Sequence, residues 1–405
     1  VRETVVFRGR AILEPSIEGF KPFHETYRIV TFALSIGMIY PNPRTEFARL
    51  AAIPLVLLST SPLTAMVLWD MYKCFTERDV VNMIRHSTVL GPFLGGLFKM
   101  LLMFHKRIQA KQIMDEISRD HSMFNSFSDK YKTIAHGWIT NSQRFSEKAW
   151  LITVTTCVMT FPVMAVAQNL YNFIFLSEPT KYMIHDLRKP NSPEEDRFSS
   201  PYFEIMFAYM FYCSVIYVVN FTGYDGFFGL AINHACLKMD LYCTALEDAF
   251  KADADEVYWR VVGVIKEQCR IFVDIIQDTF NIWLGLIFLA TMIQICTCLY
   301  HITEGFGFDL RYLVFVIGAV IHIYLPCRYA AKLKALVNTH RIYSSGWEQV
   351  DNLLVRKLIP FMVARAHAHY EITAFGMMAF DMELFLSVSF VHSSLTTFTK
   401  RKLLQ

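Results

Sequence analysis

Apolar residues along this chain gather in long, nearly unbroken runs, and polar residues concentrate in the stretches between them. The hydrocarbon core of a bilayer is about 30 Å thick, so a helix needs about 20 consecutive apolar residues to cross it. Seven runs come near that length: 50–69, 80–104, 150–175, 202–232, 280–300, 310–325 and 384–398. The pattern therefore predicts an all-α membrane protein with seven transmembrane helices.

The last of these runs is the least regular. Ile372 to Phe380 is apolar, Asp381 and Glu383 interrupt the pattern, and Leu384 to Phe398 then mixes apolar residues with serine and threonine. Such polarity is tolerated at membrane depth where it faces protein or water. We therefore expect the final helix to lie inside an assembly, sheltered from lipid.

A shorter apolar stretch runs from Tyr27 to Tyr40 and ends at the sequence Pro41-Asn42-Pro43. It is too short to cross a bilayer as a helix. It is predicted to be an interfacial or re-entrant segment.

Lysine and arginine are distributed unevenly between the connecting segments. One alternate set carries 25 of them: 1–43, 105–148, 233–270 and 328–371. The other set carries ten: 71–79, 176–201, 300–311 and 399–405. Because positively charged loops stay in the cytoplasm, the N-terminus is predicted to be cytoplasmic and the C-terminus extracellular. Heptahelical G-protein-coupled receptors have the opposite orientation, which disfavours that class.

The same pattern divides the chain into four parts. They are a cytoplasmic N-terminal and re-entrant segment, six transmembrane helices, a cytoplasmic helical domain, and a last helix with an extracellular C-terminus: 1–43, 44–327, 328–371 and 372–405. In the third part, apolar residues recur at helical spacing. Helices are therefore expected to extend below the membrane and to pack against one another or against other subunits.

The composition and the absence of known motifs argue against several classes of protein. Hydrophobic residues make up 54% of the chain and charged residues 19%, below the roughly 25% of soluble domains. The net charge of +3 is too small to suggest nucleic-acid binding. No HExxH, GxSxG, P-loop or Rossmann glycine pattern occurs, and His367 and His369 point apart on a helix. Neither an enzyme, a cofactor nor a metal site is predicted.

The C-terminal fifth of the chain contains a distinctive set of motifs. They are ALVNTHRIYSSGW at 335–347, KLIPFM at 357–362, Arg365-Ala366, Ala374-Phe375-Gly376, and the pattern Phe380, Phe385, Ser387, Val388, Ser393, Thr396 and Phe398. Together these motifs resemble the C-terminal signature of insect odorant receptors. GMIYP at 37–41 is a weaker match, with Tyr40 where the family commonly has tryptophan. The basic tail and His392 also depart from the family pattern.

The resemblance implies an architecture and a function. Odorant receptors are seven-helix subunits, with a cytoplasmic N-terminus, of tetrameric ligand-gated cation channels whose last helices surround a central pore. Their shared co-receptor has a large insertion between the fourth and fifth helices, whereas segment 233–270 is short in this chain. The chain thus looks like a ligand-tuning subunit that assembles with co-receptor subunits in the membrane of an olfactory neuron dendrite. A homotetrameric channel stays open, and so does a gustatory receptor, although the gustatory TYhhhhxQF pattern is not matched.

Small, volatile, apolar odorants need a pocket of aromatic and methionine walls with few polar groups. The resemblance places that pocket in the outer half of the membrane. The candidate residues on the second to sixth helices are Ile84, Thr88, Val89, Phe161, Met164, Gln168, Met206, Tyr209, Met210, Cys213, Phe288, Met292, Ile295, Tyr312 and Phe315. Ordinary helix packing or lipid contact is the alternative interpretation of each.

Pore-lining residues should follow three- or four-residue spacing on the last helix. The candidates are Val391, Leu395, Phe398 and Lys402, with Asp381 or Glu383 facing the conduction path near the start of the helix. Alternatively, Asp381 and Glu383 cap the helix or pair with the preceding helices. The resemblance also implies subunit contacts through the cytoplasmic helices, at Tyr343, Trp347, Leu358, Phe361 and Arg365.

Overall fold

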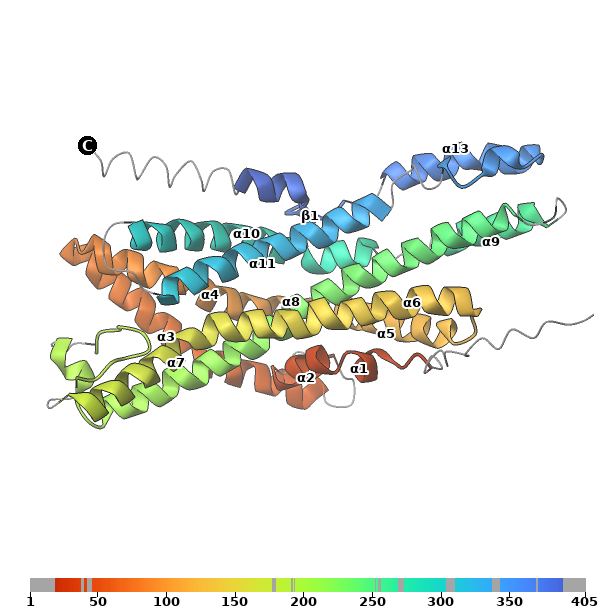
Figure 1. The fold of residues 1–405 in the computed structure, drawn as a ribbon. Helices are drawn as coiled ribbons and strands as arrows, with labels where there is room; N and C mark the ends of the chain where they lie inside the picture. Colours follow the sequence, from red (N-terminus) through yellow and green to blue (C-terminus); the bar gives the residue numbers. More distant parts are fainter. Residues whose placement is uncertain are drawn as a thin grey trace, which may run out of the picture.

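A computed structural model describes residues 19–388, apart from short gaps at 38–39, 42–45, 177–179, 191, 193, 252, 254–255, 269–272, 304–309, 337–342 and 369–370. In the described part the chain is mostly helical, and its long helices run roughly along one axis (Figure 1). One end of this elongated bundle holds helix α13 (Leu353–Ala368), and the other holds the turn between α3 (Glu46–Glu77) and α4 (Val80–His105).

Six helices are long and apolar enough to cross a membrane. They are α3, α4, the continuous rod Asp129–Phe175 that ends in α7 (Trp150–Phe175), α8 (Tyr202–Ala249), α10 (Val273–Thr303) and α11 (Leu310–Leu336). All six correspond to predicted apolar runs. Several extend beyond them, because their ends continue into a packed bundle. The predicted seventh run, 384–398, falls largely outside the described residues, which contain only its beginning as a helix from Met382 to Val388.

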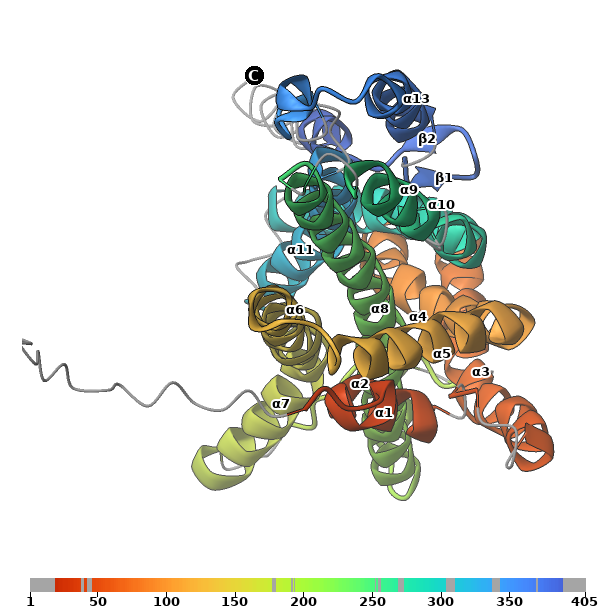
Figure 2. The same ribbon diagram turned by 90° about the vertical axis from the view of Figure 1, so that its right-hand side faces the viewer.

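Helix α8 is the centre of the structure. Viewed along the bundle, it lies in the middle with the other helices around it (Figure 2). Nearly every residue from Thr222 to Met239 is buried, whatever face of the helix it occupies. An apolar helix buried all round forms the core of a large bundle.

Shorter helices complete the end of the bundle near α13. They are α1 (Phe23–Thr26), α2 (Arg28–Ile36), α5 (Arg107–Phe124), α6 (Asp129–Ser142), the π-helical turn η2 (Gln143–Ala149) and α9 (Val257–Gln268). The predicted re-entrant segment is thus the short helix α2, which packs on α8 through Val30 and Leu34. Two 3-10 turns, η3 (Glu194–Phe198) and η4 (Trp347–Gln349), lie in connections.

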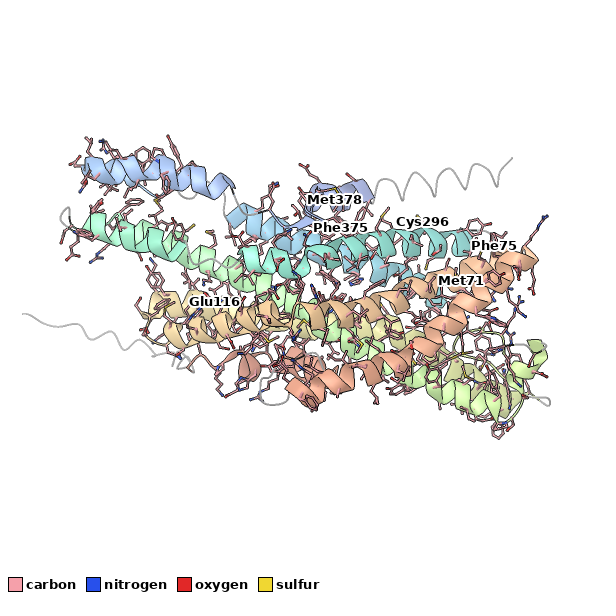
Figure 3. All side chains as sticks on the ribbon, turned by 180° about the vertical axis from the view of Figure 1, so that it is seen from behind. Met71, Phe75, Glu116, Cys296, Phe375 and Met378 are labelled. Atoms are coloured by element: carbon pink, nitrogen blue, oxygen red, sulfur yellow. The ribbon has the colours of Figure 1, made fainter. Side chains whose placement is uncertain are left out.

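The segment Ile372 to Phe380, predicted as the apolar beginning of the last helix, is instead a β-hairpin. Strand β1 (Thr373–Ala374) pairs antiparallel with β2 (Met378–Ala379). Phe375 and Gly376 both have positive φ, at 53° and 67°, which is the geometry of a tight hairpin turn. The hairpin lies against α10, whose Cys296 is farther along the same helix (Figure 3).

Buried apolar residues form two separate clusters. The larger one surrounds the C-terminal half of α8 and reaches α13. The smaller one lies toward the α3–α4 turn, between α3, α4, α7, α8 and α11. Its aromatic and sulfur-containing side chains make it the candidate ligand site.

Candidate functional site

We call the smaller apolar core the roofed cluster. Its members are buried, apolar and contributed by several helices and one connecting segment: Leu63, Val67, Val89, Phe93, Phe161, Ala165, Met183, Ile184, Leu187, Met206, Met210, Cys213, Tyr217, Cys298, Tyr312, Phe315 and Val316. Aromatic and sulfur-containing side chains are prominent in it. Such walls suit a small apolar ligand, because methionine side chains adapt to the shape they enclose.

Aromatic rings give the roofed cluster a defined interior. The Phe161 ring meets Phe315 edge-on at 5.3 Å between centroids and Tyr312 at 6.1 Å. On the other side, Phe93 and Tyr217 stack at 5.0 Å. Edge-to-face and offset-stacked rings are the favoured aromatic arrangements. The rings therefore hold one another in position.

The segment between α7 and α8 forms a roof over this cluster. Met183, Ile184 and Leu187 are buried in it. Asn169 on α7 fixes the roof, because its side chain accepts from the Tyr182 N–H and donates to the Tyr182 carbonyl, both at 2.7 Å. Asn172 donates to the Thr180 carbonyl, also at 2.7 Å. The roof is thus tied to the helix beneath it.

His185 is the polar group that the roof places against the aromatic rings. Its imidazole lies 5.4 Å from Phe93 and 5.5 Å from Phe161 between ring centroids. Burial, reinforced by the charge of Arg311, lowers the pKa of His185 to about 3. A neutral imidazole is a hydrogen-bonding group compatible with an apolar ligand.

Three ionisable side chains meet next to the cluster, on its side away from the α3–α4 turn and in the middle of the bundle. The Lys99 ammonium lies 2.7 Å from the Asp225 Oδ2 atom, and His322 Nε2 lies 2.9 Å from the same oxygen. These residues belong to α4, α8 and α11, and we call them the charged triad. The Lys99 ammonium also lies 3.4 Å from the centroid of the Phe221 ring, a cation–π contact.

A cavity of about 50 Å³ joins the two features. Phe315 of the roofed cluster and His322 of the charged triad both line it, with Gln294 on α10. Drug-sized ligands occupy pockets of roughly 300–1,000 Å³, so a ligand of that size would have to displace side chains of the cluster. The cavity therefore borders both the roofed cluster and the charged triad.

Comparison with known proteins identifies the family. Residues 79–390 match the family model described as 7tm Odorant receptor. The chain belongs to this odorant receptor family. The match spans five of the six candidate membrane helices and most of the C-terminal motifs, so the chain is a multi-pass membrane receptor and not an enzyme.

Solved structures with the same fold include the insect olfactory receptor OR5 from Machilis hrabei in complex with eugenol. The TM-score is 0.72 at 13% identity, and the alignment covers 93% of this chain and 99% of that one. The OR5 structure described without eugenol aligns with a TM-score of 0.70 at 13% identity, covering 92% of this chain and 96% of that one. No curated protein gives a significant match.

The structure of this odorant receptor brings about half of the predicted ligand residues together. Within or against the roofed cluster lie Val89, Phe161, Met206, Tyr209, Met210, Cys213, Tyr312 and Phe315. Tyr209 adds a polar edge, because its hydroxyl donates to the Ser59 carbonyl at 2.9 Å and accepts from the Leu63 N–H at 3.2 Å.

The other predicted ligand residues lie elsewhere. Phe288 and Met292 pack against the larger core. Thr88 and Ile295 are buried outside both clusters, Ile84 and Met164 are half-buried, and the exposed Gln168 donates to Asn172. Linear sequence gives the depth of a helical residue but not the face that it presents.

Sequence reasoning missed the roof residues and the charged triad. The roof was predicted only as a connecting segment, although Met183, Ile184 and Leu187 are spaced as in an apolar stripe. Lys99, Asp225 and His322 are far apart in sequence, each within an apolar run. A charge inside a membrane span marks a functional candidate, and that signal was available.

The predicted subunit-contact residues lie near the α13 end. Tyr343 and Phe361 are exposed, at 64% and 58%. Trp347 and Leu358 are half-buried against the larger core. Arg365 lies on α13, and its side chain is outside the described residues.

The predicted pore residues are only partly described. Val391, Leu395, Phe398 and Lys402 lie outside the described residues. Glu383 is exposed. Asp381 caps the helix that begins at Met382, because its Oδ1 accepts from the N–H groups of Glu383 and Leu384 at 3.0 Å each.

Proposed function

We propose that this chain is the odorant-binding subunit of a ligand-gated, nonselective cation channel, and that the roofed cluster is its odorant site. The observation that carries the proposal is the burial of aromatic and methionine side chains under a roof that also presents a neutral histidine. The ligand class is a small, volatile, mostly apolar molecule. The eugenol bound by the fold relative from Machilis hrabei supports an aromatic odorant with one or two polar groups.

Binding would act by opening the packed cluster. An odorant gains affinity only by replacing the ring contacts of Phe161 and Phe315 with its own, and methionines can move aside at little cost. A ligand shifts a conformational equilibrium through its differential affinity for the two states. Enlargement of the cavity at Phe315 would then move His322 relative to Asp225, which links occupancy to the centre of the bundle.

The proposed channel is a tetramer with co-receptor subunits in the plasma membrane of an olfactory neuron dendrite. Support comes from α13, where Val355, Ile359 and Met362 are buried while Leu354 and Phe361 remain exposed by more than half. An exposed apolar face at one end of a membrane protein suits contact with neighbouring subunits. The last helix, from Met382 onward, would line the shared pore.

The test is current in oocytes that express this chain with and without a co-receptor, under a panel of odorants. An odorant-evoked inward current that needs both chains supports the proposal. Current from this chain alone would replace the heteromer with a homotetramer. A chain that reaches the surface with the co-receptor and never responds contradicts the receptor assignment.

The site itself is tested by Phe161→Ala, compared with Phe175→Ala on the same helix. Phe161 is buried and Phe175 is 68% exposed. Losing a buried aromatic contact worth about 1.5 kcal/mol should raise the half-maximal odorant concentration about tenfold. Phe175→Ala should leave it unchanged. Phe161→Leu changes the volume of the side chain less than Phe161→Ala does. It replaces the alanine variant in this test if the alanine variant reaches the cell surface poorly.

A further inference from the structure

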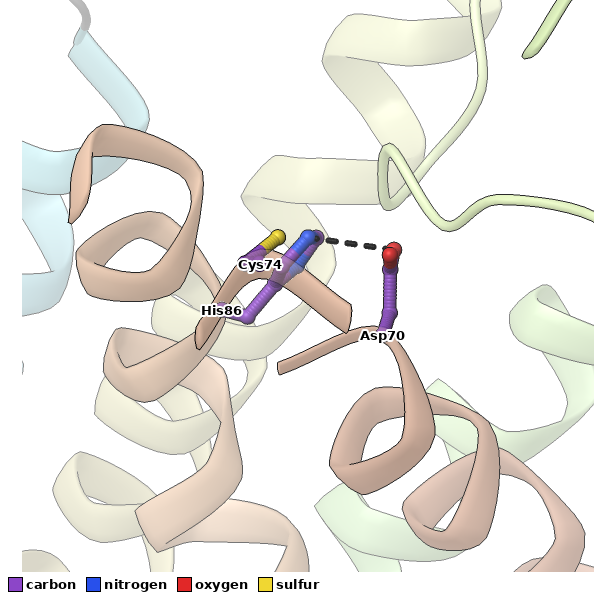
Figure 4. Close-up of side chains that lie close together, drawn as sticks. All are labelled: Asp70, Cys74 and His86. Atoms are coloured by element: carbon purple, nitrogen blue, oxygen red, sulfur yellow. Dashed lines mark ion pairs between the residues drawn. The ribbon is translucent and has the colours of Figure 1, made fainter. Parts of the chain in front are cut away.

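Three potential metal ligands converge beside the roof, where α3 ends and α4 begins. Asp70 and Cys74 are four residues apart on α3 and share one face, and His86 on α4 lies opposite (Figure 4). One ligand atom from each side chain lies within 4.8 Å of the other two, and all three residues are buried. The His86 Nε2 atom is 3.1 Å from Asp70 Oδ2.

These separations are close to those that a tetrahedral metal imposes. Zinc binds imidazole nitrogen and carboxylate oxygen at about 2.0–2.2 Å and thiolate sulfur at about 2.3 Å. Ligand atoms around one ion therefore lie about 3.3–3.8 Å apart. Small side-chain rotations would bring the three atoms to that spacing. An oxygen, a nitrogen and a sulfur together favour zinc, cobalt or cadmium over calcium or magnesium.

The surrounding charge also favours a dication. The Arg188 guanidinium lies 3.5 Å from Asp70 Oδ1, 2.5 Å from Glu77 Oε2 and 3.7 Å from Asp79 Oδ2. Three carboxylates thus surround this one guanidinium. Asp70 Oδ1 is buried and makes no hydrogen bond among the described residues.

Access is through the turn between the two helices. Glu77 and Asp79 flank this turn with side chains 50% and 30% exposed. Their carboxylates would raise the local concentration of cations at the entrance. When the Arg188 guanidinium leaves Asp70, it can keep its contact with Glu77. Binding of the ion therefore does not leave Arg188 without an acidic partner.

We propose that Asp70, Cys74 and His86 form a binding site for a zinc-class transition-metal dication, which competes with the Arg188 guanidinium. On binding, the Cys74 thiol releases its proton to the solvent, and His86 carries its proton on Nδ1 so that Nε2 can bind the ion. The ion takes the three side chains plus one water or nearby carboxylate oxygen. In the metal-free protein the guanidinium contacts two of the three ligand residues, Asp70 and, at 3.9 Å from its sulfur, Cys74.

The site has a consequence that rests on the proposed function. Arg188 directly follows the buried part of the roof segment, and its backbone N–H donates to Asp70 Oδ2 at 3.0 Å. Leu187, its neighbour, is buried in the roofed cluster. A metal that takes Asp70 would release this part of the roof and weaken the odorant response.

Binding is measured with cobalt(II) added to the purified full-length receptor. One equivalent should produce the charge-transfer absorption of a cobalt–thiolate bond, and zinc should displace it. Cys74→Ser should abolish this absorption, and His86→Ala should weaken binding at least tenfold. Cys296→Ser is the matched control, because Cys296 is exposed on α10, and it should bind like the wild type.

The competition between the metal ion and the Arg188 guanidinium is tested with a separate variant. Arg188→Gln should tighten cobalt binding about tenfold, whereas a guanidinium that only supports the fold would give unchanged or weaker binding. Wild-type protein without a cobalt–thiolate absorption, or absorption that persists in Cys74→Ser, overturns the site. Each variant is compared as a monodisperse protein, and the wild-type titration decides the question without any substitution.

The functional measurement is separate from the binding measurement. External zinc should raise the half-maximal odorant concentration of the wild type and not of Cys74→Ser. Cobalt binding without any effect of zinc on current would leave the metal site standing and overturn its link to the roof. Absence of odorant current altogether would count against the proposed function and not against the metal site.

Discussion

Lys99, Asp225 and His322 are residues whose arrangement depends on one another. Lys99 and His322 meet the same oxygen, Asp225 Oδ2, while Asp225 Oδ1 is buried without a hydrogen bond among the described residues. A buried charge that loses its partner costs far more than an exposed one. The triad is therefore expected to be sensitive to single substitutions and tolerant of paired ones.

We predict that Lys99→Met destabilises the protein by about 3 kcal/mol, because it leaves Asp225 with only His322. The double variant Lys99→Met/Asp225→Asn should recover part of the loss. Lys111→Met, at a side chain 44% exposed, is the control and should change little. Thermal unfolding in detergent is the measurement. Equal losses in the single and double variants would mean that the triad is not a coupled unit.

His121, near the end of α5, is fully buried at the α13 end of the bundle. Its Nδ1 lies 2.8 Å from the Lys21 carbonyl, and its ring faces His234 at 5.7 Å. Asp120 and Lys238 are the nearby charges. Burial and then the charge of His234 lower the pKa of His121 to about 4. The imidazole is therefore neutral in the folded state.

This lowered pKa predicts an acid-sensitive fold. Below pH 6.5 the unfolded chain takes up a proton at His121, whereas the folded chain does so only near pH 4, so protonation favours unfolding. Stability should fall between these values by an amount on the order of 3 kcal/mol. His121→Phe should make the unfolding temperature fall less steeply between pH 6.5 and 4.5, with the remaining slope left to other buried histidines such as His185. His24→Phe, at an exposed histidine, should not, and a flat wild-type profile would show that His121 does not control acid stability.

At the scale of elements, the hairpin before the last helix differs from the sequence prediction. The apolar run from Ile372 to Phe380 was predicted as helix because hydrophobicity alone does not distinguish a short buried strand from a helix. The deciding signal was Gly376, which permits the positive φ of a tight turn. Gln277 then fixes β1, donating to the Thr373 carbonyl at 2.9 Å and accepting from its N–H at 3.0 Å.

The hairpin depends on a close approach to α10 at Gly285. A Cβ atom at this position would collide with the Phe375 ring. Gly285→Ala should therefore destabilise the protein by about 1–3 kcal/mol. At Gly137 in α6 a Cβ atom would have no neighbour within 4 Å, so Gly137→Ala should instead stabilise by up to about 1 kcal/mol. Thermal unfolding measures both, and Phe375→Ala should relieve the Gly285→Ala defect. Failure of that rescue would show that the hairpin does not pack as described.

For the whole molecule, the hydrophobic pattern was sufficient to predict six spanning helices, because each must be apolar over its full length. It was not sufficient to select the ligand residues. Phe161 and Phe315 meet across two helices that are far apart in the sequence, and Phe288 was chosen by depth although its side chain faces the other core. Helix rotation and the fold of the roof are set by packing between elements, which one sequence does not display.

A second cavity gives a competing location for a ligand. It has a volume of about 470 Å³ and lies between the α5–α6 turn, α8 and α9, with Phe127 and Tyr131 among its lining residues. It is larger than the 50 Å³ space beneath the roofed cluster. Volume alone would favour it, whereas odorant binding in the roofed cluster requires side chains that move apart when the odorant enters.

Photolabelling with an active odorant that carries a diazirine distinguishes the two locations most directly. The full receptor is irradiated with the probe, and the labelled peptides are identified by mass spectrometry with and without excess parent odorant. We predict competable labelling on α7, α11 or the roof segment, near Phe161, Phe315 or Met183. Competable labelling confined to the α5–α6 turn around Phe127 and Tyr131 would contradict the central claim that the roofed cluster binds the odorant.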